Sequence, residues 1–277
     1  MANAIRRLWD GDHAEVRRCQ ACGFGFGSPF VGGDEEFYEL MHEQHSYPSW
    51  RWDYDVALSQ APSGGAALDI GAGRGLFLKG LPEGWSRNAV ESTATMKDLL
   101  RGDGIEVYED LRSAPSAAFD LVTMFQVLEH ISDFRGTLAE CSRVMRPGAT
   151  ITITVPDADA MFDQERLTGC PDSPPNHIGK WTPATLARVL DEQGLTARSV
   201  TREPASWGRV AGMLHLKVMA DALRRNSLAG RAFAIQDRRV RAPALAAVAL
   251  ATSLPMLLEL QKLRAGGAFG ITAQKAA

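Results

Sequence analysis

The sequence predicts an α/β fold in which a mainly parallel sheet is covered by helices on both faces. From residue 66 onward, short apolar runs alternate with segments of helical apolar spacing. A glycine-rich turn, Gly71 to Gly75, directly follows the first run. The run 119–125 is mostly apolar, as expected for a strand buried on both faces. Such alternation of strands and helices is typical of a parallel sheet between two helical layers.

Five strands are expected in the first part of this alternation. Each is a short apolar or β-branched run that ends at a turn or at a helical segment. The runs are 66–70, 88–91 (the end of a strand), 105–108, 119–125 and 150–155.

Helices are expected between these strands. The first is about 76–81, and the second, 133–145, carries its apolar residues on one stripe. Pro147-Gly148 is expected to end the second helix. A third helix opens with Thr182 as cap and Pro183 in its first turn, and it ends at Gly194.

The turn after the first strand carries the most information about function. It reads Asp69-Ile-Gly71-Ala-Gly73-Arg-Gly75 and lies between a strand and a helix. Glycines let the backbone turn sharply and approach a ligand closely. Glu91 ends the next strand, where a carboxylate can accept hydrogen bonds from both hydroxyls of an adenosine ribose.

The spacing distinguishes this turn from a dinucleotide-binding turn. In the G-x-G-x-x-G fingerprint the third glycine falls at the position that Leu76 occupies here. In addition, Asp69 would repel phosphate just before the first glycine, and it suits a ligand that carries an ammonium group. Binding of NAD is therefore disfavoured.

Four segments, in chain order, resemble motifs of the class I S-adenosylmethionine (SAM)-dependent methyltransferases. Residues 69–75 are similar to motif I, and 119–130 to the strand in which FD-x-V runs into an LEH turn. Residues 146–156 resemble the K-P-G turn with the fifth strand. Residues 175–186 resemble the H-x-x-x-x-(S/T)-P-x-x-L block of a subgroup that includes ubiquinone-biosynthesis and natural-product methyltransferases. The resemblance covers roughly residues 66–200.

The resemblance implies a Rossmann-like sheet of seven strands, six parallel and one antiparallel, with helices on both faces. It implies a degenerate zinc-ribbon-like segment (1–33), an N-terminal helical lid (34–62) and a SAM-binding domain (63–277). The last two strands, about 196–206 and 269–273, would flank a helical insertion of about 207–265.

The resemblance also implies a role for single residues. Asp69, Gly71 and Gly73 would line the methionine end of SAM, Glu91 would hold the ribose, Asp110 and Leu111 would flank the adenine, and Gln126 would lie near the methyl group. Asp110 could equally be a plain turn residue.

A methyl acceptor that reacts through oxygen must lose a proton, and histidine is the side chain suited to a base near neutral pH. His177 is the preferred catalytic candidate, because it lies in a loop before a capped helix. His130 is the second, although it could serve only to shape its turn, and Asp157 could simply cap a loop. A nitrogen or carbon acceptor is the alternative, and it can react without a dedicated base.

The N-terminal region offers two further features. Cys19-x-x-Cys22-Gly23 resembles one zinc knuckle, but a zinc site needs four ligands and His13 is the sole nearby addition, so we expect no bound metal. The aromatic residues of the lid could contact cofactor or substrate, or could pack the lid on the domain; they are Tyr38, Tyr47, Trp50 and Trp52.

Residues 242–258 carry no charge and follow three arginines, Arg238, Arg239 and Arg241. A membrane-spanning helix needs about 20 strongly apolar residues, and this run is shorter and contains two prolines. We expect a buried or interfacial helix of the domain. The alternatives are peripheral membrane contact, contact with an apolar substrate, or a homodimer surface.

Composition narrows the class of function. The net charge of −3 gives no basic excess for nucleic acid. Four cysteines and an N-terminus without an apolar core favour a cytoplasmic protein. We therefore expect SAM-dependent methyl transfer to a small molecule, with oxygen as the acceptor atom. The alternatives are methylation of a lipid or quinone at a membrane surface, and a SAM-binding protein without catalysis.

Overall fold

The computed structural model describes residues 2–10, 13–34, 37, 50–172, 174–224 and 226–277. The chain forms two compact units, which are described separately below. The first comprises residues 1–157, 173–202 and 268–277, and the second comprises 158–172 and 203–267. The expected division at residues 33 and 62 stays a prediction.

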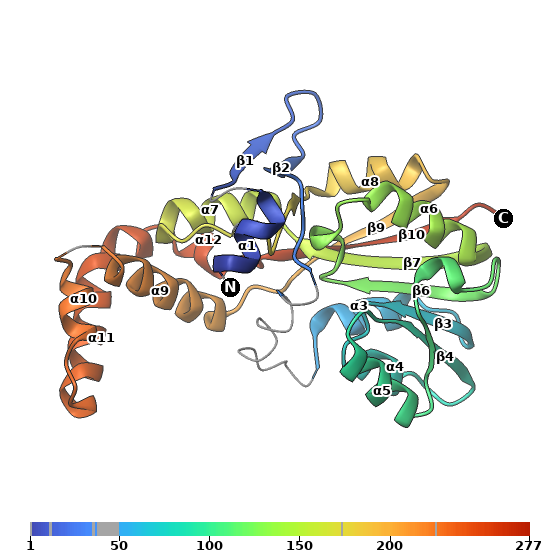
Figure 1. The fold of residues 1–277 in the computed structure, drawn as a ribbon, viewed down its shortest axis with the longest axis horizontal. Helices are drawn as coiled ribbons and strands as arrows, with labels where there is room; N and C mark the ends of the chain where they lie inside the picture. Colours follow the sequence, from blue (N-terminus) through green and yellow to red (C-terminus); the bar gives the residue numbers. More distant parts are fainter. Residues whose placement is uncertain (1, 11–12, 35–36, 38–49, 173, 225) are drawn as a thin grey trace. The chain divides into compact units, whose positions relative to one another are not determined.

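The first unit is built on a seven-stranded sheet with the order β5-β4-β3-β6-β7-β10-β9 (Figure 1). Strand β10 runs antiparallel to both of its neighbours, and the other neighbouring pairs are parallel. The predicted sheet of six parallel strands and one antiparallel strand is therefore confirmed. The strands are β3 (Gly65–Ile70), β4 (Trp85–Val90), β5 (Glu106–Tyr108), β6 (Phe119–Phe125), β7 (Met145–Pro156), β9 (Leu195–Arg202) and β10 (Ala268–Lys275).

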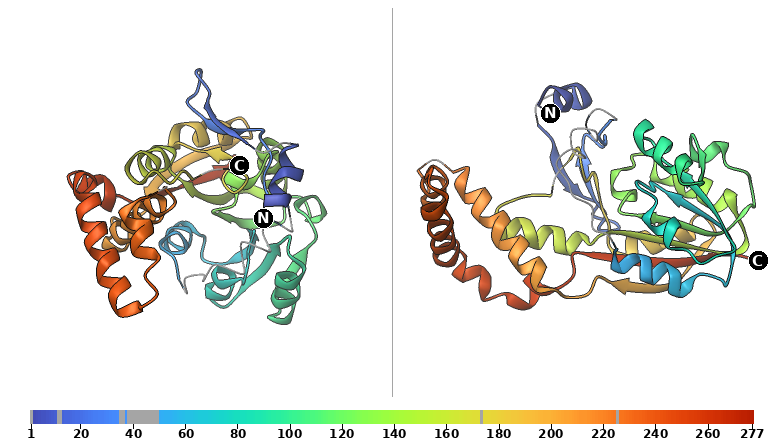
Figure 2. Two further views of the ribbon diagram at one scale, coloured as in Figure 1. Left: turned by 60° about the vertical axis from the view of Figure 1, so that its left-hand side comes forward. Right: turned by 90° about the horizontal axis from the view of Figure 1, so that it is seen from below.

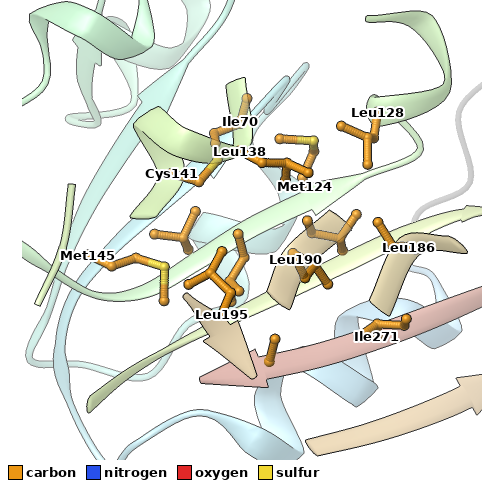
Figure 3. Close-up of a cluster of buried hydrophobic side chains, with 14 of the residues drawn as sticks. Ile70, Met124, Leu128, Leu138, Cys141, Met145, Leu186, Leu190, Leu195 and Ile271 are labelled. Atoms are coloured by element: carbon orange, nitrogen blue, oxygen red, sulfur yellow. The ribbon is translucent and has the colours of Figure 1, made fainter. Parts of the chain in front are cut away.

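Helices cover both faces of this sheet. Because side chains alternate along β6, Val122 and Met124 enter one core, while Leu121 and Phe125 enter the other. The first core is completed by residues of α6 and α8, such as Leu138 and Leu186 (Figure 3). The second core is completed by residues of α3, α4 and α5. The helices are α3 (Trp52–Gln60), α4 (Leu76–Gly80), α5 (Ala94–Gly102), α6 (Phe134–Val144) and α8 (Pro183–Asp191).

The prediction that Pro147-Gly148 ends a helix is wrong. Helix α6 already ends at Val144, and β7 begins at Met145. The pairing of β6 with β7 shifts between Phe119 and Leu121, so the residues around Pro147 bulge out of the ladder. Within a bulge a proline needs to donate no ladder hydrogen bond, and Gly148 adopts a φ of +78°.

The N-terminal segment carries regular secondary structure. Within the expected zinc-ribbon-like segment (1–33) lie α1 (Ala2–Trp9), β1 (Glu15–Arg18) and β2 (Gly25–Ser28). Strand β2 also pairs with the short β8 (Gly179–Lys180) in a second sheet. Phe24 anchors this segment to the first unit, because its ring packs against Phe134 and Trp181. The abundance of turn residues in the sequence gives no sign of this packing.

The second unit is helical. It contains α7 (Ala158–Thr168), α9 (Trp207–Ala222), α10 (Leu228–Phe233), α11 (Arg238–Leu257) and α12 (Leu260–Arg264). Helices α9, α10 and α11 pack beside one another (Figure 2). A small core holds the unit together and includes Leu167, Val210 and Met256. Arg166 donates two hydrogen bonds of 2.8 Å to the Glu259 carboxylate.

Residues 242–258 were expected to form a buried or an interfacial helix, and the buried alternative is wrong. Helix α11 is long and apolar enough to cross a membrane, with 20 residues and a mean hydropathy of 1.5 over its most apolar window. Only 11% of that window is buried. The helix lies at the margin of a small unit, whose core reaches one side of it only.

Candidate functional site

The residues predicted to bind a cofactor meet at the carboxyl ends of neighbouring parallel strands. Asp69 lies in β3, Glu91 follows β4 directly and Gln126 follows β6 directly. Since β4, β3 and β6 are adjacent and parallel, these residues share one edge of the sheet. The edge was predictable from the sequence, because each of these residues lies at or next to the end of a predicted strand.

The glycine turn after β3 is tightly shaped. Gly71, Gly73 and Gly75 have φ values of +72°, +53° and +67°, which side chains rarely adopt. A Cβ added at Gly71 would lie 2.5 Å from Val127 Cγ2, so this glycine allows the turn to pack against the end of β6. A Cβ at Gly73 would meet nothing within 4 Å. The backbone at Gly73 therefore borders open space.

Asp69 is a buried carboxylate. Thr123 Oγ1 donates a hydrogen bond of 2.8 Å to its Oδ1, and only 3% of the residue is exposed. Burial raises the pKa of Asp69 to about 7, against the lowering effects of the Thr123 hydroxyl and of Arg51. Such a group favours a cationic partner, which would stabilise its charged form.

Glu91 is held by backbone amides. Its Oε2 accepts from the Gly73 N–H at 2.8 Å, and its Oε1 accepts from the N–H groups of Ser92 and Thr93 at 2.8 and 3.0 Å. The residue is 7% exposed. This carboxylate is fixed beside the glycine turn, and it has further acceptor capacity for a ligand hydroxyl.

Gln126 has a backbone conformation that is uncommon for a residue with a side chain, with φ at +58°. Its N–H donates to the Thr154 carbonyl at 2.9 Å, and this bond secures the turn after β6. Uncommon backbone conformations of this kind concentrate at functional sites.

Sequence reasoning missed the group of polar residues next to this turn. Asp53 is fully buried, accepts from Thr154 Oγ1 at 2.9 Å and pairs with Arg51 at 2.5 Å. This network fixes the start of α3 to the sheet, and the charge of Arg51 reaches Asp69. No local pattern could have revealed it, because Asp53 and Thr154 are 101 residues apart in the chain.

Asp110 and Leu111 stand at the end of β5. The Asp110 carboxylate accepts from the Ser113 N–H at 2.8 Å and so caps a short 3₁₀ helix, Leu111–Ser113. Leu111 is buried in the core of the first unit. Both positions have a structural role, and their expected contact with adenine stays a prediction.

The two candidate catalytic histidines lie side by side. The rings of His130 and His177 are 4.8 Å apart, and each Nε2 lies 3.9 Å from Oε1 of the fully buried Glu129. Nδ1 of His130 lies 2.6 Å from the Asn176 carbonyl, which can only accept, so Nδ1 carries the proton. With Nδ1 as the donor to this carbonyl, Nε2 is the ring nitrogen of His130 that faces the Glu129 carboxylate. Glu129 was missed as a member of this group, although the LEH motif contains it.

Asp157 is less suited to the role of base. It is buried and forms an ion pair with Arg202. Its carboxylate is thus already engaged by a guanidinium of the neighbouring strand β9.

Of the aromatic residues of the expected lid, Trp50 and Trp52 are described, and their contact with cofactor or substrate stays a prediction. Trp50 donates to Asp55 at 2.9 Å and packs against Gly80, and the Trp52 side chain is close to Gly270. Tyr38 and Tyr47 lie outside the described residues.

Cys19 and Cys22 lie in the turn between β1 and β2. Backbone hydrogen bonds from the turn lower the pKa of the Cys19 thiol. Among the described residues, the group of side chains placed to share a metal ion is Glu129, His130 and His177, and it contains neither cysteine.

The donor set at the sheet edge fits SAM. Asp69 offers a buried carboxylate for an ammonium group, and Glu91 offers acceptors for ribose hydroxyls. Gly73 borders open space at the same turn. Within the turn 71–75, Arg74 is the one basic residue, and it is exposed. The turn is therefore poorly suited to the pyrophosphate of a dinucleotide.

Comparisons with known proteins agree with this geometry. A sequence model of a family described as a methyltransferase domain matches residues 43–200. A ubiquinone biosynthesis O-methyltransferase of Xanthomonas oryzae pv. oryzae is 26% identical over 121 residues, which are 40% of this chain and 50% of that protein. The chain thus spans about half the length of the curated relatives it matches.

Solved structures share the fold. One is a complex of the Haloferax volcanii Trm112 methyltransferase activator with a methyltransferase, at a TM-score of 0.52 and 15% identity, covering 88% of this chain and 95% of that chain. Another is the Burkholderia thailandensis 1,6-didemethyltoxoflavin-N1-methyltransferase with its substrate and S-adenosylhomocysteine, at a TM-score of 0.50 and 16% identity, covering 87% and 86%.

Proposed function

The chain belongs to the class I SAM-dependent methyltransferases, and from this premise we propose that it methylates an oxygen atom of a small-molecule acceptor. The observation that carries the proposal is the pair of histidines on the buried Glu129 carboxylate, beside a sheet edge that fits SAM. The partial similarity to ubiquinone biosynthesis O-methyltransferases supports oxygen as the acceptor atom.

Each part of the sheet edge has a proposed task in holding the cofactor. Asp69 binds the amino group, Gly71 and Gly73 allow close approach of the backbone, and Glu91 binds the ribose hydroxyls. Gln126 orients the end of β6 toward the reacting atoms. When bound, SAM supplies a methyl group that its sulfonium has already activated, so the protein mainly positions donor and acceptor.

The proposed base is His177. Its Nε2 takes the proton of the acceptor hydroxyl, and the Glu129 carboxylate 3.9 Å away stabilises the imidazolium that results. His130 is the positioning residue, because its bond to the Asn176 carbonyl fixes the loop that carries His177. In this step the O–H bond of the acceptor breaks, and an N–H bond forms on the imidazole of His177.

A second candidate function is methylation of a lipid or quinone at a membrane surface. The observation that favours it is the exposed apolar face of α11. A SAM-binding protein without catalysis is the remaining alternative, and the paired histidines argue against it.

Calorimetric titration with SAM and with its demethylated product tests the cofactor part of the proposal. We expect micromolar binding that Glu91→Ala removes. A screen of phenolic, sugar and quinone acceptors with radiolabelled SAM then tests the acceptor. Methylation confined to amines, and unchanged by His177→Ala, would contradict the oxygen assignment.

A further inference from the structure

The outward face of α11 is apolar along its length. Four large side chains on it are strongly exposed: Val240 by 52%, Leu250 by 67%, Leu254 by 60% and Leu258, just past the helix end, by 84%. The other exposed residues between Val240 and Leu258 are alanines and prolines at positions 242, 243, 246, 247, 251 and 255. A helix with this character is normally covered on that face, because exposed apolar surface is unfavourable in water.

The opposite face of α11 packs against other helices of the second unit. Residues 241, 244, 245, 248, 249, 252, 253 and 256 are less exposed and recur at helical spacing. Met256 packs with Val210 and Met213 of α9. Protein therefore covers one side of the helix, and the apolar outward side has no cover in the described chain.

Apolar side chains continue from α11 onto the helices that pack against it. Leu223 at the end of α9 is 87% exposed, and Leu228 and Phe233 of α10 are 61% and 36% exposed. Of the 14 large apolar residues that are exposed in the described chain, nine lie in residues 203–267. Exposed apolar surface is thus concentrated in this unit rather than spread evenly over the chain.

Positive charge accompanies this surface. Residues 203–267 contain ten Lys and Arg residues and four Asp and Glu residues, in a chain with a net charge of −3. Arg238 and Arg239 are exposed at the start of α11, and Arg231 is exposed on α10. All four acids are already engaged: Asp221 pairs with Lys217, Asp237 caps α11, Glu259 pairs with Arg166, and Glu203 accepts from the Gly267 N–H.

We propose that α11 lies flat in the surface of an anionic lipid bilayer, with its outward face in the acyl region and its arginines among the lipid phosphates. A second copy of the chain fits less well, because a two-fold interface pairs the same surface of both copies and so brings no patch of negative charge to these arginines. A spanning arrangement fits less well too, because the inward face packs on α9, which carries Arg209 and Lys217. This proposal does not rest on the proposed methyl transfer.

Co-sedimentation of the full chain with vesicles tests the proposal. We expect the protein to pellet with vesicles of phosphatidylcholine and phosphatidylglycerol, and to pellet at least tenfold less with phosphatidylcholine alone. Raising the salt concentration from 0.05 M to 0.5 M should weaken the binding, because it screens attraction to the headgroups.

The variant Leu250→Glu/Leu254→Glu should lower partitioning about a hundredfold, since each leucine contributes roughly tenfold when its side chain is buried. The matched control is Leu99→Glu/Val200→Glu, which changes two exposed apolar residues of the first unit. Arg238→Gln/Arg239→Gln should remove most of the preference for anionic vesicles. Circular dichroism confirms that each variant is folded.

Two results would overturn the proposal. One is folded protein that remains in the supernatant with both kinds of vesicle. The other is a dimer in light scattering that Leu250→Glu/Leu254→Glu converts to a monomer, because a second copy would then cover α11. SAM binding, measured in parallel, is expected to be unchanged in these variants, so a failure of the proposed function would be seen separately.

Discussion

Gly73 donates its backbone N–H to the carboxylate of Glu91 at 2.8 Å, and this bond ties the glycine turn after β3 to the acid after β4. The glycine turn and Glu91, the two most informative features of the sequence, therefore form one hydrogen-bonded site. A ligand that engages Glu91 also meets a turn whose shape Glu91 helps to fix.

Replacing Glu91 tests the contribution of this site to SAM binding. Glu91→Gln is expected to weaken SAM binding about tenfold to a hundredfold, because a charged acceptor contributes roughly 1.5–3 kcal/mol to a hydrogen bond. Calorimetric titration measures the change. Glu83→Gln is the matched control, since Glu83 is exposed and follows α4 away from this edge. Equal affinities for the two variants would remove Glu91 from the site.

Asp69 should make the stability of the free protein depend on pH. Its pKa is raised from 3.8 to about 7 in the folded chain, so its stabilising contribution is full below about pH 4 and is lost as pH rises through 7. Between pH 5 and 8 the loss is about 3 kcal/mol, at roughly 1.4 kcal/mol per pKa unit. Urea unfolding at both pH values measures it. Asp69→Asn should flatten this part of the profile, and an unchanged slope in that variant would assign the effect elsewhere.

Binding of SAM should release a proton near neutral pH. At pH 7 about half of the Asp69 carboxyls are protonated in the free protein, and an ammonium group beside Asp69 favours the charged form. About 0.5 proton per site should be released at pH 7. Calorimetry in buffers of different ionisation enthalpy measures the number. Proton uptake at pH 7 would contradict the placement of the ammonium group.

Two glycines of the same turn should respond differently to alanine. Gly71→Ala combines a φ of +72° with a contact of 2.5 Å to Val127, and we expect it to destabilise the fold by about 3 kcal/mol. Gly73→Ala adds only the strain of its backbone, about 1 kcal/mol, since its Cβ meets open space. Its main effect should be weaker SAM binding. Thermal unfolding with and without SAM separates the two outcomes.

The histidines should affect turnover rather than cofactor affinity. With an acceptor found by screening, His177→Gln is expected to lower kcat by about a hundredfold to ten-thousandfold and to leave SAM binding unchanged. His130→Gln should have a smaller effect, because His130 acts through the loop. His215→Gln is the control, since His215 is exposed on α9. A pH profile of kcat that keeps its acidic limb in His177→Gln would rule out this base.

Local patterns sufficed for much of the fold. The strand 119–125 was predicted to the residue, because burial on both faces gives an uninterrupted apolar run. Thr182 and Pro183 located the start of α8, since capping is a local interaction. Pro147-Gly148 was wrongly predicted to end a helix, because proline and glycine are common both after a helix and in a bulge of a strand.

The candidate site was predictable only where the chain itself places residues at strand ends. Asp69 lies near the end of an apolar run, and Glu91 and Gln126 lie at or just after the ends of two others, so these residues could be predicted. Asp53 and Glu129 could not, because their importance depends on burial and on partners far along the chain, such as Thr154 and His177. The exposure of α11 was missed for a similar reason, since apolar composition does not tell which surface a helix meets.

The connection between β9 and β10 has an evolutionary meaning. Arg202 ends β9 and pairs directly with Phe269 at the start of β10, so residues 203–267 leave and rejoin the sheet at neighbouring positions. Topologically, they are the loop of a hairpin. A short turn could replace them without breaking a strand pair, and a different module could be exchanged at the same position. The sheet edge that fits SAM and the apolar helices can therefore change independently, under separate selection.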